Sequence, residues 1–220
     1  MQDRHYFLLK RLHSLSGVVP VAGFVIFHLF ENSNSVAGQE AFNHTTHTIR
    51  SLPYLYLLEI GLLAPLVFHA LGGAYLAFSS KPNVGQFSNR ANWSYFLQRV
   101  TGAILLFFIG YHVWTTRFAG VASDQMFQYL AQQYSQPAIS AFYALGILSA
   151  AFHLANGLWG FTVTWGLVTG AKSMDLAWKL FMGLGLAVAL MGLNALAGFH
   201  GKGVDLFNHV EPAAAAPAAQ

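Results

Sequence analysis

The sequence predicts an all-α fold, an integral membrane bundle of five transmembrane helices. Of the 220 residues, 55% are hydrophobic and only 9% are charged, whereas soluble domains carry about 25% charged residues. Five apolar stretches are each long enough to cross a bilayer, which takes about 20 helical residues. Part of the chain also returns at a fixed offset, since residues 51–73 resemble residues 135–157. We therefore expect the first four helices to form two duplicated pairs.

The five predicted spans follow one another with short connections. They cover residues 12–30, 52–78, 95–116, 138–169 and 180–199. The fourth is longer than a bilayer requires, so we expect it to tilt or to project from the membrane. The polar connection 31–50 carries His44 and His47, which should face water. Residues 1–200 form one domain in this interpretation, and the proline-containing tail 201–220 is expected to be disordered.

The distribution of positive charge predicts the orientation. Eight of the 11 Lys and Arg residues lie at one end of the predicted spans and three at the other, which places the N-terminus in the cytoplasm by the positive-inside rule. The chain has no cysteine, and this excludes disulfides, thiolate metal sites and covalent c-type heme attachment. A metal would have to be held by histidine or carboxylate.

Four histidines within the spans follow the repeat. An offset of 84 residues relates His28 to His112 and His69 to His153, and 41 residues separate the two histidines of each half. At 1.5 Å per helical residue, His28 and His112 lie about 5–8 Å below the outer boundary, and the other two about 24 Å below it. Each level thus receives one histidine from each half.

Two histidines at each level predict two b-type hemes, because a porphyrin supplies four nitrogens and leaves two axial positions for imidazoles. His28 and His112 would hold the iron of an outer heme, and His69 and His153 that of an inner heme. A zinc site would be left half empty by such pairs. Interhelical hydrogen bonding by single histidines and a histidine proton relay in a transporter or channel are the alternatives.

Several other residues are candidates for the surroundings of the hemes. Gly73 and Gly157 each follow a histidine by four residues, where a side chain would collide with a flat macrocycle. Close helix packing is the other explanation for these glycines. His13, Ser14 and Arg99 begin their spans on the inner side; Arg99 could pair with a heme propionate or simply anchor its helix.

Glu59 is the only carboxylate within the predicted spans, near the level of His28 and His112. A buried acid at that depth is a candidate proton acceptor beside the outer heme. A structural carboxylic acid, hydrogen-bonded to an adjacent helix, is the alternative.

Several motifs together resemble one family of membrane proteins. They are RLHSLSG at 11–17, LEIGLLAPLVFHALGG at 58–73, LQRVTG at 97–102, YHVW at 111–114 and FHLANGLWGFTVTWG at 152–166. The chain resembles the single-chain, di-heme cytochrome b membrane anchors of the succinate dehydrogenase and fumarate reductase family, in the form found in succinate:menaquinone reductases. The resemblance covers about residues 5–200 and implies the same histidine pairs as heme ligands. Some fumarate-reducing members have a glutamate at the position of Ala151, so a proton path through it is in doubt here.

The resemblance also implies partners and a location. A flavoprotein subunit with FAD and an iron-sulfur subunit would dock on the cytoplasmic face of a prokaryotic inner membrane and carry out the succinate chemistry. Electrons would pass through the two hemes to a quinone, with menaquinone favoured. A di-heme cytochrome b of a hydrogenase or formate dehydrogenase shares the ligand pattern and is the nearest alternative.

Overall fold

The computed structural model describes residues 2–79 and 83–206, and this part of the chain is helical with no strand. Five helical stretches within it are long and apolar enough to cross a membrane. They are Arg4–Ala37, α4 (Leu55–Phe78), α5 (Arg90–Thr116), α7 (Pro137–Thr164) and α8 (Ala171–Gly198). Helices satisfy every backbone polar group internally, which a lipid environment requires. The predicted fold class is confirmed.

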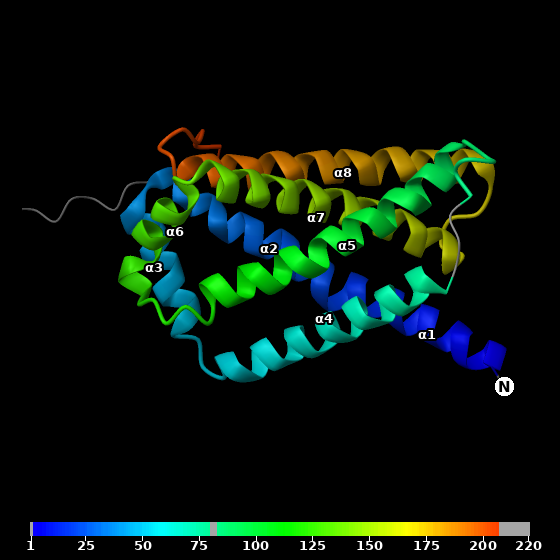
Figure 1. Ribbon diagram of the computed structural model, residues 1–220, viewed down its shortest axis with the longest axis horizontal. Helices are drawn as coiled ribbons and strands as arrows, with labels where there is room; N and C mark the ends of the chain where they lie inside the picture. Colours follow the sequence, from blue (N-terminus) through cyan, green and yellow to red (C-terminus); the bar gives the residue numbers. More distant parts are fainter. Residues whose placement is uncertain (1, 80–82, 207–220) are drawn as a thin grey trace, which may run out of the picture.

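The first span is a chain of four helical segments that crosses the bundle obliquely (Figure 1). They are α1 (Gln2–Ser16), the π-helical η1 (Gly17–Ala22), α2 (Gly23–Asn32) and the 3₁₀ segment η2 (Ser33–Ala37). Pro20 lies inside η1 and has no N–H to donate, so the regular hydrogen-bond pattern is interrupted there. The span continues in both directions beyond the predicted 12–30.

The predicted boundary between the fourth and fifth spans was wrong. α7 ends at Thr164, five residues before the predicted end, and α8 starts at Ala171, nine residues before the predicted start. The turn between them contains Gly166 at φ 71° and Gly170 at φ 91°, a left-handed conformation that glycine adopts without strain. α7 and α8 therefore have the same length, 28 residues each.

The longer helices also correct the statement that Glu59 is the only carboxylate within a span. Glu31 lies in the first helical stretch and Asp175 in α8. Asp175 forms ion pairs with Arg90 at 2.6 Å and with Lys179 at 2.7 Å.

Two short helices cap the end of the bundle opposite the N-terminus (Figure 1). They are α3 (Gln39–Arg50) and α6 (Met126–Tyr134), the latter preceded by the 3₁₀ turn η3 (Ser123–Gln125). The expectation of plain connections was therefore wrong for both segments. Apolar side chains of α3 and α6 join those of the spans in a buried cluster: Phe42, Phe108, Met126, Leu130, Tyr134, Tyr143 and Phe199.

The five spans differ in how tightly they pack. α7 and α8 lie side by side (Figure 1), and small residues allow a close approach, since a Cβ on Gly185 would lie 2.7 Å from that of Ala155. In α4, only 6% of the most apolar window is buried, against 39% in α7. α4 packs mainly on α1, η1 and α5. Its other faces present apolar side chains outward, as a lipid-facing helix does.

The chain after α8 folds back on it as far as the structure describes it. Asn194 donates to the carbonyl of Val204 and accepts from its N–H, both at 2.8 Å. Most of the tail that was expected to be disordered, 207–220, lies outside the described residues.

Candidate functional site

The outer pair consists of His28 on α2 and His112 on α5. Their ring centroids are 5.6 Å apart with an interplanar angle of 71°. Each ring stacks on a phenylalanine one helical turn earlier, His28 on Phe24 at 5.2 Å and His112 on Phe108 at 5.8 Å. These phenylalanines were not predicted, although the same offset of 84 residues relates them. That offset was the signal that could have found them.

The inner pair consists of His69 on α4 and His153 on α7, with ring centroids 6.1 Å apart and an interplanar angle of 85°. A third ring joins it, because His13 of α1 stacks on His69 at 4.1 Å. The buried Nδ1 of His13 has no hydrogen-bond partner among the described residues.

Hydrogen bonds orient both rings of the inner pair. Nδ1 of His69 lies 2.9 Å from the carbonyl oxygen of His13, which can only accept. Nδ1 of His153 lies 3.2 Å from the hydroxyl of Thr101, whose proton is donated to the carbonyl of Leu97. Both Nδ1 atoms therefore carry the ring proton, and Nε2 is left free to bind a metal.

The spacing of the two pairs fits a metal held between facing imidazoles. Metal–nitrogen bonds of about 2 Å on both sides place the ring centroids about 6 Å apart. The helices that carry each pair, α2 with α5 and α4 with α7, are not closely packed along their backbones in residues 2–79 and 83–206. No group of three or more His, Cys, Asp or Glu side chains in those residues could hold a metal ion. The donor set therefore suits a metal that brings its remaining ligands, as a porphyrin iron does.

Two glycines that were not predicted as site residues face the inner pair. A Cβ on Gly17 of η1 would lie 2.4 Å from Cε1 of His69, and one on Gly102 of α5 would lie 3.2 Å from Cε1 of His153. Each glycine precedes a histidine on its own helix, by 11 and 10 residues respectively. This recurrence in both halves was the signal that could have found them.

The glycines that were predicted have other neighbours. A Cβ on Gly73 would lie 2.9 Å from Cε1 of His13, and one on Gly157 would lie 3.4 Å from Nε2 of Gln98. Both therefore permit close helix approach at the level of the inner pair.

Ser14 and Arg99 do not contact the histidine pairs in the recorded hydrogen bonds and ring contacts. Ser14 donates to the carbonyl of Arg11 and accepts from the indole of Trp165 at 3.0 Å, which ties the start of the first span to the end of α7. The guanidinium of Arg99 lies 5.4 Å from the ring centroid of Tyr95 on its own helix.

Glu59 lies in an ion pair at the capped end of the bundle. Its carboxylate accepts from Nε of Arg117 at 2.6 Å and from a terminal nitrogen of the same guanidinium at 3.1 Å. The two side chains are 26% and 41% exposed. The hydrogen bond to Glu59 raises the pKa of Arg117, whereas burial, with Arg117 nearby, lowers the pKa of Arg50. The interaction of Glu59 with Arg117 was not predicted.

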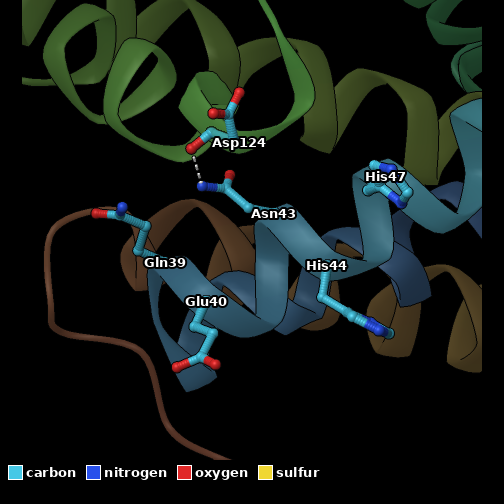
Figure 2. A pocket seen from close by; sticks show the side chains of 6 residues that line it. All are labelled: Gln39, Glu40, Asn43, His44, His47 and Asp124. Carbon is cyan, nitrogen blue, oxygen red and sulfur yellow. Dashed lines mark hydrogen bonds between the residues drawn. The ribbon is translucent and has the colours of Figure 1, made fainter.

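An open pocket of about 530 Å³ lies on the outside of α3, lined by Gln39, Glu40, Asn43, His44, His47 and Asp124. Figure 2 shows Asn43 bonded to the backbone of Asp124, with Glu40 and His44 directed away from Asp124. His44 and His47 are both exposed. These histidines are far in sequence and structure from the paired ones, and they take no part in the site described above.

The fold and the site together define a class, a helical membrane protein with facing histidine pairs between its spans. The family model of the succinate dehydrogenase/fumarate reductase transmembrane subunit matches residues 79–193. Over 201 residues the chain is 43% identical to the succinate dehydrogenase cytochrome b558 subunit of Bacillus subtilis, which covers 90% of this chain and 100% of that relative. Over 66 residues it is 41% identical to the succinate dehydrogenase hydrophobic membrane anchor subunit of Halobacterium salinarum, which covers 30% of this chain and 50% of that relative.

The chain therefore belongs to the family of cytochrome b membrane anchor subunits of succinate dehydrogenase and fumarate reductase. The resemblance stated from the sequence motifs is confirmed.

Proposed function

We propose that this subunit carries electrons between the iron-sulfur clusters of a partner subunit and a quinone through two b hemes, each held by two histidines. The observation that carries the proposal is the presence of two histidine pairs with ring centroids 5.6 and 6.1 Å apart, each joining two helices that do not otherwise pack closely. His28 and His112 would hold the outer heme, and His69 and His153 the inner one. When bound, heme supplies reversible one-electron transfer.

The protein's own contribution is to fix the ligands and to exclude water. Neutral imidazole is the form that binds iron, and an apolar interior disfavours the charged form of histidine. The inner pair is already in the required tautomer, because the Nδ1 protons of His69 and His153 are donated to oxygen atoms. Four residues held on four different helices then set the positions of both irons before the cofactor binds.

The orientation follows from charge. Arg4, Lys10 and Arg11 lie at the N-terminal end of the first span, which would face the cytoplasm of a prokaryotic cell. A flavoprotein subunit with FAD and an iron-sulfur subunit would dock at that end, next to the inner pair. The outer pair, near α3 and α6, would then serve the quinone, for which menaquinone is the favoured type.

Glu59 is the proposed proton acceptor for quinone chemistry at the outer pair. Arg117 occupies both of its oxygens in the structure, so this role requires the ion pair to open. The carboxylate is partly exposed, which gives protons a short route to the aqueous phase.

The proposal is tested by spectroscopy of the purified succinate dehydrogenase complex. Reduced-minus-oxidised spectra should show b-type bands with two hemes per copy of this chain. His28→Ala or His112→Ala should remove one heme signal and spare the other, and His69→Ala or His153→Ala should do the reverse. His44→Ala, on the exposed face of α3, is the matched control and should keep both. Loss of both signals in every paired-histidine variant of a fully assembled complex would refute the pairing.

A further inference from the structure

A ligand histidine has a second ring nitrogen, and the partner of that nitrogen tunes the metal. With Nε2 on the iron, Nδ1 must carry the proton, and a hydrogen-bond acceptor makes the imidazole a stronger donor to the metal. The inner ligands have such acceptors in the carbonyl of His13 and the hydroxyl of Thr101. The outer pair has a different arrangement.

Nδ1 of His112 lies 3.4 Å from the hydroxyl of Tyr143 on α7. Tyr143 is only 4% exposed, so its hydroxyl is not simply a surface group that happens to be near. The group recorded beside Nδ1 of His28 is the amide nitrogen of Asn32, 3.4 Å away, which donates at 2.7 Å to the carbonyl of His28 itself. Tyr143 is therefore the acceptor available to the outer pair.

The phenol ring of Tyr143 is fixed by its neighbours. The ring centroid of Tyr134 lies 4.5 Å away, and that of Phe108 lies 5.3 Å away in an edge-to-face contact. Its hydroxyl also interacts with those of Tyr134 and Thr115. Phe108 is itself pressed against α7, since a Cβ on Gly146 would lie 2.4 Å from its ring. The helix that carries His112 and the helix that carries Tyr143 are thus held in register at this point.

We propose that Tyr143 is a positioning residue of the outer heme, which accepts a hydrogen bond from Nδ1 of His112, fixes its tautomer and lowers the reduction potential of the outer iron. The inference rests on the proposed function, because it requires iron on His112. A more electron-rich imidazole stabilises oxidised iron over reduced iron, so the hydrogen bond shifts the potential downward.

The test is a redox titration of the purified complex with Tyr143→Phe, which keeps the ring and removes the acceptor. The midpoint potential of the outer heme should rise while that of the inner heme stays unchanged. A tenfold loss of preference for oxidised iron, the low end of what such partners contribute to metal affinity, corresponds to about 59 mV for one electron. The low-spin electron paramagnetic resonance signal of the outer heme should shift as well.

Two further variants act as controls. Thr101→Val removes the acceptor of His153 and should move only the inner potential. Tyr129→Phe removes a hydroxyl that donates at 3.0 Å to the carbonyl of Thr115, close to the cluster but not on His112, and should move neither.

The outcomes separate the two proposals. If the wild-type complex lacks two b-type signals, the proposed function itself fails. If both signals are present but Tyr143→Phe leaves the outer potential and spectrum unchanged, or moves both hemes equally, the role of Tyr143 is refuted. If Tyr143→Phe fails to assemble, Tyr143→Trp, which keeps an aromatic ring without an acceptor oxygen, provides the same reading.

Discussion

The inner and outer histidine pairs have similar spacing and different surroundings. Around the inner pair lie polar groups, with Gln98 donating to the backbone carbonyl of His153 and Asn156 donating to Gln98. Around the outer pair lie aromatic rings, with Phe24 and Phe108 stacked on the histidines and Tyr143 edge-on to His112. The two pairs thus use different forces to hold the same kind of ligand.

The difference shows that directional bonds and packing fix a ring in separate ways. A hydrogen bond to Nδ1 sets the tautomer and the rotation of the ring about its axis, whereas stacking fixes the plane and resists displacement. The inner pair should therefore be sensitive to any change that moves a ring away from its acceptor. The outer pair should be sensitive to the loss of packing volume.

The largest effect is expected from Gly17→Ala. The new Cβ would lie 2.4 Å from Cε1 and 2.7 Å from Nδ1 of His69, so the ring must move and its bond to the carbonyl of His13 is lost. Overpacking of this kind costs about 1–3 kcal/mol. The inner heme signal should be lost or strongly reduced in reduced-minus-oxidised spectra, with the outer signal retained.

Gly23→Ala is the matched control for that substitution. Gly23 lies one helical segment further along the same span, and a Cβ there would meet nothing within 4 Å. Both signals should keep their wild-type intensity. Equal inner signals in the Gly17→Ala and Gly23→Ala proteins would show that η1 does not position His69.

A smaller contrast is expected between Phe108→Ala and Asn156→Ala. Phe108 is 9% exposed, and removing a buried phenylalanine costs about 3 kcal/mol. Asn156 is 6% exposed and donates to Gln98 at 2.8 Å, but interhelical hydrogen bonds in membranes average only about 0.6 kcal/mol. Unfolding in increasing denaturing detergent should thus show the larger loss for Phe108→Ala. The outer heme signal should weaken first in that variant, and the inner signal first in Asn156→Ala.

Much of the fold could be predicted because lipid imposes one rule on every span. Runs of about 20 apolar residues must be helical, and this rule located all five spans. It does not set where a helix ends outside the apolar region. The end of α7 at Thr164 depends on Gly166 and Gly170, whose positive φ values become apparent only in the folded chain. The helical character of α3 and α6 was missed because neither is apolar enough to be a span.

The histidine pairs could be predicted in part because helical rise converts residue number into depth. Depth alone says nothing about which side chains approach from other helices. Tyr143 comes next to His112 only because Phe108 packs against Gly146. The pairing of Glu59 with Arg117 likewise depends on the start of α4, where Tyr54 takes a left-handed conformation at φ 59°, so counting residues from Pro53 could not reveal it.

The smallest effect is expected from Glu59→Gln, which leaves the size of the side chain nearly unchanged. An exposed ion pair contributes about 0–1 kcal/mol, so stability and both heme signals should stay at wild-type levels. If Glu59 accepts a proton during quinone chemistry, quinone turnover by the complex should fall in Glu59→Gln. It should be retained in Arg117→Gln, because that variant frees the carboxylate to act. Equal slowing in both variants would instead assign the pair a structural role at the end of α4 and α5, since only the ion pair itself is common to the two changes.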